Sequence, residues 1–323
     1  MSPVRDRLYP ENARLLAQLD DAPLPGDPRF DLARSRREVS RSAPAWLGTG
    51  RCVVRDAELA GVPCRVYCPP RPQGMVVHAH GGGFVEGDLE THDAVCRELS
   101  VCSGWAVAAV DYRLAPEHPF PAAYEDVEAV VDEVRSGGPR PPALEGVPRE
   151  PVALVGDSAG AVIVAGITLR ERRARAGAPT RFALQVLVYP DCGQVDGLVA
   201  VPDIERGFGL TPEARDWYHT AFVPDGGDVE ELAPLRSGSY ADLPPAVVIT
   251  AELDPLRESA EEYAARLAGA GVPVVCTRYL GAVHGFWRRP GHLQSATAAV
   301  DQVAAALRRL ADGRGEDEDT PAG

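Results

Sequence analysis

The sequence predicts an α/β fold built on a mostly parallel, eight-stranded sheet with helices on both faces. Eight short apolar runs are spread along its 323 residues, and segments of helix length separate most of the later ones. These runs are apolar almost throughout, which is typical of strands buried between two layers of helices. The expected strands are 52–59, 64–69, 75–80, 105–112, 152–157, 182–190, 246–253 and 272–280.

The order of the elements predicts a body and a cap. The first two strands precede any helix, so we expect them to form an antiparallel edge. Helices are expected at 92–103, 122–136, 158–176 and 257–270, with a last one over the apolar repeat from 293 to 310. Residues 191–239 break the alternation with a loop rich in Gly, Pro and Asp and a single amphipathic segment, 211–222. We predict a catalytic body of residues 46–190 and 240–312, a cap from 1–45 and 191–239, and a disordered acidic tail, 313–323.

Composition excludes several classes of partner. A net charge of −14 argues against nucleic acid and against an anionic membrane surface. No apolar stretch is long enough to span a membrane, and the first residues lack the apolar core of a secretory signal, which favours the cytoplasm. The seven cysteines are scattered, without a CxxC pair or a histidine cluster. We therefore expect reduced core thiols, no metal site and no cofactor.

The segment "VALVGDSAGA", residues 152–161, predicts a strand, a sharp turn and a helix around Ser158. Its G-x-S-x-G pattern is that of a nucleophile elbow, in which small residues two before and two after the serine avoid clashes at the turn. Such a turn lifts the serine hydroxyl off the carboxyl end of the sheet, at the start of a helix. The alternative is a serine that merely occupies a glycine turn. The strand and helix on either side favour the nucleophile.

Three consecutive glycines follow the third expected strand, in "HAHGGGF". Without side chains, the backbone N–H groups of Gly82 and Gly83 can point at a reacting carbonyl and, with the N–H of Ala159, form an oxyanion hole. The alternative is a flexible loop. We expect His80 to hold this loop by hydrogen bonds rather than to transfer protons.

A base and an acid follow later strands in the order that such an elbow requires. Asp254 comes directly after the strand 246–253, and His284 follows the strand 272–280. Asp254 precedes a proline and also fits the start of a helix, so catalysis and helix capping are both compatible with it. Glu252 is the rival acid, although its place within the strand directs it less freely toward a loop. For His284, the alternative is a structural histidine in a glycine loop.

Several long stretches resemble the hormone-sensitive-lipase-like family of α/β-hydrolases, in its bacterial carboxylesterase branch. They are "HGGGFVEGDLETHD", "DYRLAPEHPFPAAYED", "GDSAG", "DPLRE" and "HGF", between about residue 75 and residue 287. The resemblance implies an α/β-hydrolase fold with a helical cap, a catalytic triad of Ser158, Asp254 and His284, and Gly82, Gly83 and Ala159 as oxyanion donors. It also implies a serine carboxylesterase that needs no cofactor and hydrolyses short-chain acyl esters. Ala161 stands where the family commonly has another glycine.

The pocket and the partners are less well defined by the sequence. Expected pocket residues are Phe84 and Phe286 beside the catalytic loops and Phe208, Leu210, Trp217 and Phe222 in the cap, where the alternative role is packing of the cap onto the body. The same triad also suits a deacetylase, a lactonase or a biosynthetic acyltransferase, and the fold also hosts lyases and ligand-binding proteins. The apolar edge strand 272–280 predicts a homodimer through paired edges.

Overall fold

A computed structural model describes residues 8–19, 23–175, 177–178, 180–193, 195, 210–225 and 230–317. Its centre is a single eight-stranded sheet in the order β1-β2-β4-β3-β5-β6-β7-β8. The strands are β1 Val53–Leu59, β2 Val62–Cys68, β3 Met75–Ala79, β4 Ala106–Val110, β5 Val152–Asp157, β6 Leu184–Val188, β7 Ala246–Leu253 and β8 Val274–Val283. Strand β2 is antiparallel to both of its neighbours, β1 and β4. Strands β3 to β8 all run parallel to one another. The predicted fold class and antiparallel edge are therefore confirmed.

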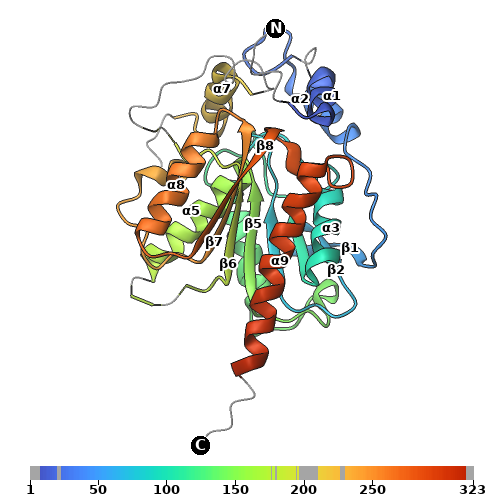
Figure 1. Ribbon diagram of the computed structural model, residues 1–323, viewed down its shortest axis with the longest axis vertical. Helices are drawn as coiled ribbons and strands as arrows, with labels where there is room; N and C mark the ends of the chain where they lie inside the picture. Colours follow the sequence, from blue (N-terminus) through green and yellow to red (C-terminus); the bar gives the residue numbers. More distant parts are fainter. Residues whose placement is uncertain are drawn as a thin grey trace, which may run out of the picture.

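Helices cover both faces of the sheet (Figure 1). Helices α4 (Ala122–Arg135), α5 (Ala159–Ala174) and α8 (Arg257–Gly269) pack on one face, in a core that includes Val127, Ile163 and Tyr263. Helices α3 (Asp93–Ser103) and α9 (Gln294–Asp317) pack on the other, through side chains such as Leu99 and Val303. Strands β3 to β7 are buried along their whole length, which explains their unbroken apolar runs.

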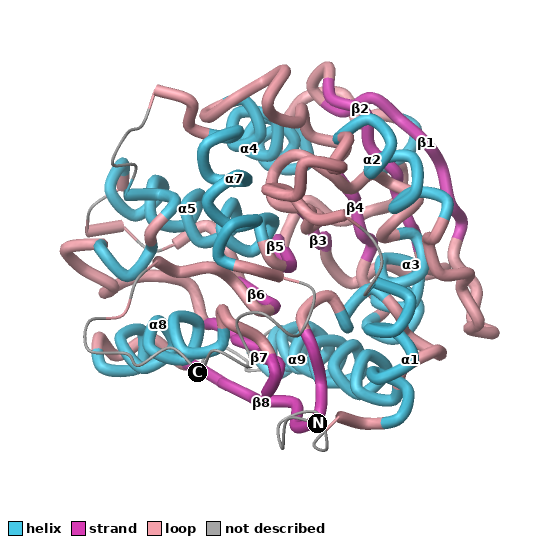
Figure 2. The backbone as a smooth tube through the Cα atoms, turned by 90° about the horizontal axis from the view of Figure 1, so that it is seen from above, coloured by secondary structure: helices cyan, strands magenta, loops and turns pink. Residues whose placement is uncertain are grey.

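Three helices lie over the end of the sheet toward which β7 and β8 point (Figure 1). They are α1 (Pro10–Leu19), α2 (Leu32–Arg41) and α7 (Pro212–Phe222), from the two segments predicted to form a cap. Seen from above, the ends of β3 and β5 are visible between α7 and α2 (Figure 2). Two short 3-10 helices within the second segment, Glu230–Leu232 and Pro234–Arg236, pack instead against α5 on the body.

The C-terminal end differs from its prediction. Helix α9 runs to Asp317, so residues 313–317 of the predicted disordered tail are helical, and 318–323 lie outside the described residues. Extending an existing helix gains one hydrogen bond for each residue ordered, so a short polar segment can continue a well-packed helix. All seven cysteines are free thiols, but the prediction that they lie in the core holds only for Cys64, Cys96 and Cys192. Cys52, Cys68 and Cys102 are half-buried, and Cys276 on β8 is exposed. In the described part of the chain, no helix is both long and apolar enough to cross a membrane.

Candidate active site

Three polar side chains that are far apart in the sequence meet at the carboxyl end of the sheet. Ser158 follows β5, Asp254 follows β7 and His284 follows β8. Ser158 Oγ lies 3.0 Å from His284 Nε2, and His284 Nδ1 lies 2.7 Å from Asp254 Oδ2. The Asp254 side chain is fully buried, whereas the His284 side chain is 17% exposed, so the imidazole faces the cavity while its carboxylate partner is shielded from water.

The turn that carries Ser158 has the strained backbone of a nucleophile elbow. Ser158 has φ +52° and ψ −122°, a conformation that side-chain-bearing residues rarely adopt, and it immediately precedes α5. A Cβ atom at Gly160 would clash with the Ala79 carbonyl of the neighbouring strand, and one at Gly156 would clash with the Gly160 backbone. Both glycines are therefore required by close backbone approach, which is the reason that the sequence pattern gave for them.

Asp254 has two hydrogen-bond partners on its two oxygens. Besides Oδ2, which faces His284, its Oδ1 accepts from the Leu256 N–H at 2.8 Å, just before α8 begins. One carboxylate therefore contacts the histidine and closes the turn that leads into α8. The helix-capping alternative is not seen, because the N-cap of α8 is Leu256 and no side chain caps the helix. Glu252, the rival acid, lies elsewhere: its Oε2 accepts from the Gly281 N–H at 2.7 Å and ties β7 to β8.

The loop after β3 supplies backbone donors at the same place. Gly82 and Gly83 have φ +133° and +59°, and Gly82 O accepts from the N–H groups of Val85 and Glu86, which closes a tight turn. Within the described residues, none of the N–H groups of Gly82, Gly83 and Ala159 donates to another protein group. All three residues line the cavity that holds Ser158 and His284. His80 Nδ1 lies 2.9 Å from the Gly81 carbonyl, so His80 contacts its own loop, as expected.

A buried carboxylate joins this loop to the elbow. Asp157 Oδ1 accepts from the Gly81 N–H at 3.1 Å and lies 3.0 Å from His92 Nε2, while Oδ2 accepts from the Tyr189 hydroxyl at 3.3 Å. Burial alone would raise the pKa of Asp157, but the charge and hydrogen bond of His92, with smaller effects of other cations, hold that pKa below its ordinary range. Asp157 therefore stays ionised and fixes the glycine loop after β3 relative to Ser158.

The cavity above these groups has a volume of about 220 Å³ and lies under the cap. Of the expected pocket residues, Phe84, Leu210 and Phe222 line it, and the Phe84 and Phe222 rings are stacked at 4.0 Å. Phe208 lies outside the described residues. Two expectations differ from the structure, namely those for Trp217 and Phe286.

Trp217 and Phe286 do not line the cavity, because each packs elsewhere. The Trp217 ring meets Phe30 edge-on at 5.2 Å and so joins the two parts of the cap. After His284, Gly285 at φ +80° and a 3-10 turn (Phe286–Arg288) direct Phe286 into the core beside β8, where it is fully buried.

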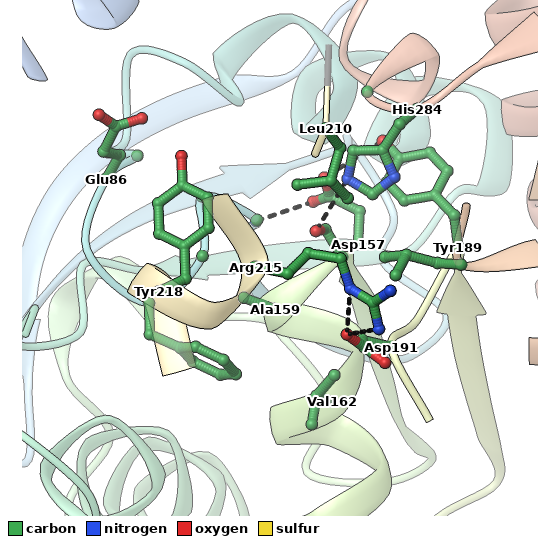
Figure 3. Close-up of a pocket in the computed structure, with 18 of the residues that line it drawn as sticks. Glu86, Asp157, Ala159, Val162, Tyr189, Asp191, Leu210, Arg215, Tyr218 and His284 are labelled. Atoms are coloured by element: carbon green, nitrogen blue, oxygen red, sulfur yellow. Dashed lines mark hydrogen bonds and ion pairs between the residues drawn. The ribbon is translucent and has the colours of Figure 1, made fainter. Parts of the chain in front are cut away.

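The charged lining of the cavity was not predicted from the sequence. Glu86, Asp191 and Arg215 border the cavity, together with Tyr189 and Tyr218 (Figure 3). Arg288 lines it as well. The signal available was position: Asp191 follows β6 at the catalytic edge, and Glu86 and Arg288 lie in the loops that carry Gly83 and His284. Arg215 is on α7, whose inward face could not be read from the sequence.

Taken together, a parallel sheet with a serine elbow, a buried acid–histidine pair and a glycine-rich donor loop defines the class of α/β-hydrolases. A family model described as alpha/beta hydrolase fold matches residues 76–288. The chain is 36% identical to Esterase LipI of Mycobacterium tuberculosis over 273 residues, which cover 80% of this chain and 81% of that one. It is 38% identical to Carboxylic ester hydrolase LipN of the same organism over 296 residues, covering 86% and 76%.

A solved structure agrees with these sequence relationships. The hyperthermophilic esterase from the archaeon Pyrobaculum calidifontis superposes with a TM-score of 0.79 at 34% identity, over 94% of this chain and 99% of that one. The chain therefore belongs to the hormone-sensitive-lipase-like family of α/β-hydrolases. It is a carboxylic ester hydrolase.

Proposed function

We propose that the protein is a serine carboxylesterase that hydrolyses short-chain acyl esters through an acyl-enzyme. The observation that carries this proposal is the hydrogen-bonded series from Ser158 Oγ through the His284 ring to Asp254, with distances of 3.0 and 2.7 Å. A serine hydroxyl is a weak nucleophile by itself and needs a base within hydrogen-bond reach. His284 meets that requirement, and Asp254 orients its ring and stabilises the imidazolium that forms.

The reaction follows from this geometry in two halves. Ser158 Oγ attacks the ester carbonyl carbon while His284 Nε2 takes its proton, and the N–H groups of Gly82, Gly83 and Ala159 stabilise the oxyanion. His284 then protonates the leaving alcohol, and the C–O bond to it breaks, which leaves an acyl group on Ser158. A water molecule, deprotonated by His284, then attacks the acyl carbonyl, and His284 returns that proton to Ser158 Oγ as the bond between Oγ and the acyl carbon breaks and the acid is released. Loss of one oxyanion donor typically costs about 10²–10³ in turnover.

The test compares the wild-type chain with Ser158→Ala on p-nitrophenyl acetate, butyrate and octanoate. We expect turnover of the two shorter esters, a single phosphonate adduct on Ser158 by intact mass, and a loss of at least about 10⁴-fold in kcat/KM for the variant. Ser136→Ala, a serine after α4 and outside the cavity, is the matched control and should keep wild-type activity.

Other outcomes separate the rival functions. Labelling of Ser158 without turnover of any model ester would favour a deacetylase, lactonase or acyltransferase with a demanding substrate. Activity that does not depend on Ser158 would contradict the acyl-enzyme and favour a lyase.

A further inference from the structure

The walls of the cavity are charged to a degree that ester hydrolysis alone does not require. Apart from Asp157, which precedes Ser158, four charged side chains line the cavity. They are Glu86 from the loop after β3, Asp191 after β6, Arg215 on α7 and Arg288 in the turn after His284. An aliphatic chain packed against such groups displaces their water without replacing its hydrogen bonds, which is unfavourable. These four groups therefore favour a substrate that carries polar groups of its own beside its apolar parts.

Arg215 and Asp191 form an ion pair that uses two of the three guanidinium nitrogens of Arg215. Arg215 Nε and Nη2 both donate to Asp191 Oδ2, at 3.3 and 3.0 Å, and Asp191 Oδ1 accepts from the Gly193 N–H at 3.2 Å. Arg215 Nη1 makes no hydrogen bond with any described residue. The two side chains are 31% and 36% exposed, and in the view of Figure 3 they lie between Val162 and His284. A ligand in the cavity can therefore reach the free edge of this guanidinium.

Glu86 and Arg288 are less completely paired. Arg288 is partly buried and makes no hydrogen bond or ion pair with any residue of the described ranges, and its Nη2 lies toward Gly285, beside His284. Glu86 is 8% exposed and has one carboxylate oxygen, Oε1, without a hydrogen-bond partner among the described residues. Burial raises the pKa of Glu86, and the charges of Arg288 and Arg36 oppose that rise. Figure 3 shows the Tyr218 ring on the same side of the cavity as Glu86.

The charges of this set balance, and the balance indicates the chemistry of the ligand. An anionic ligand would meet Glu86 and Asp191, and a cationic one would meet Arg215 and Arg288. A hydroxyl group both donates and accepts, so it can serve a carboxylate and a guanidinium at once. The aromatic rings of Phe84, Tyr218 and Phe222 supply apolar surface for the C–H faces of such a ligand.

We propose that the substrate is an ester of a polyhydroxylated alcohol, such as a sugar or a polyol, and that Arg215, Arg288, Glu86 and Asp191 select its free hydroxyl groups. This inference rests on the proposed serine esterase function and names its substrate class. A short acyl group on such an alcohol places the carbonyl at Ser158 and leaves the hydroxyl groups to the charged walls.

The test measures kcat/KM by acetate release for three esters with the same acyl group and a six-membered ring: glucose 6-acetate, cyclohexylmethyl acetate and 4-carboxycyclohexylmethyl acetate. We expect the wild-type chain to prefer the glucose ester over the cyclohexylmethyl ester by about tenfold or more, the effect of a few added hydrogen bonds. Arg288→Met and Arg215→Met should each lower this ratio several-fold. The ratio is taken within one variant, so a general loss of folded enzyme does not change it.

Arg34→Met is the matched control, because Arg34 is an exposed, ion-paired arginine of the cap that does not line the cavity. Its ratio should equal that of the wild type. A wild-type ratio of one or less, faster hydrolysis of the carboxylated ester, or an unchanged ratio in both pocket variants would overturn this inference while p-nitrophenyl acetate is still hydrolysed. Loss of activity on every ester, p-nitrophenyl acetate included, would overturn the proposed function as well.

Discussion

Single side chains at this site contact more than one neighbour. In Asp254, the contact with His284 and the contact with the backbone before α8 can be tested separately. One oxygen faces His284 Nδ1 at 2.7 Å, and the other accepts from the Leu256 N–H at 2.8 Å. An asparagine keeps the shape and an acceptor for the backbone N–H, but it no longer stabilises an imidazolium. Activity and the hydrogen bond that closes the turn before α8 should therefore respond differently to its substitution.

We expect Asp254→Asn to lower kcat by about 10³–10⁴-fold, because His284 loses its charged partner and the orientation of its ring. The free energy of unfolding should change by less than about 1 kcal/mol, since an acceptor for the Leu256 N–H is retained. Steady-state kinetics and urea unfolding check the two parts. Asp254→Ala should lose both activity and the hydrogen bond to the Leu256 N–H. Equal activity of the wild type and Asp254→Asn would contradict the role proposed for Asp254.

Among the elements, β3 and the start of α3 carry a group of buried histidines that has no place in the reaction. His78 lies on β3, and its ring centroid is 5.6 Å from that of His92, directly before α3. His80 stacks on Tyr112 at 4.1 Å. Burial, reinforced by the neighbouring histidines, lowers the pKa of His78 to about 3 and that of His80 to about 4.

These two histidines should make the stability of the fold depend on pH. In the unfolded chain both have the ordinary pKa of 6.5, so below that pH the unfolded state binds protons that the folded state excludes. Their contribution is complete above about pH 6.5 and is lost as the pH falls toward 4 and 3. Each adds a slope of up to about 1.4 kcal/mol per pH unit.

Urea unfolding at pH 7, 6 and 5 measures this slope. We expect His78→Gln to flatten it by about one proton, whereas His118→Gln, at an exposed histidine, should leave it unchanged. A free energy of unfolding that stays constant from pH 7 to pH 5 would mean that the buried histidines take up protons without opening the fold.

The elements also show which parts of the fold the sequence encodes locally. The strands β3 to β7 were predicted to within about two residues because their burial on both faces produces unbroken apolar runs. Helix α2 was not predicted: it has no buried residue and reads LARSRREVSR. Long-range contacts hold it, with Arg36 donating to the Val85 and Ala115 carbonyls and pairing with Glu117.

The residues of the site also fall into those that the sequence predicts and those that it does not. Ser158, Asp254 and His284 follow strand ends that the sequence marks clearly, and parallel strands bring such ends to one edge. The predictions for Trp217 and Phe286 were wrong because the type of a residue does not say in which direction its side chain points. A glycine at φ +80° turns Phe286 toward the core. Arg215 reaches the cavity only because α7 lies across it, and that placement depends on the packing of the whole cap.

On the scale of the whole molecule, the two edges of the sheet differ. Among the described residues, β1 is the last strand at one edge, and at the other edge β8 pairs only with β7. Gly281, near the end of β8, accepts from the Tyr9 N–H and from Asn12 Nδ2, so the N-terminal segment contacts the strand there. Val275, at the start of the strand, and Leu280, directly before Gly281, are 49% and 58% exposed. An uncovered edge strand with apolar side chains is a template for pairing with another chain.

We expect two copies of the chain to pair through β8 in an isologous dimer, because a symmetric pair of edges satisfies the free backbone groups of both. Light scattering at micromolar concentration should give twice the mass of 34.4 kDa. Val275→Lys and Leu280→Lys place charges on the edge and should yield monomers that keep esterase activity, since neither residue lines the cavity. Leu47→Lys, which replaces an equally exposed leucine away from β8, should remain dimeric. A wild-type monomer at this concentration would contradict pairing through β8.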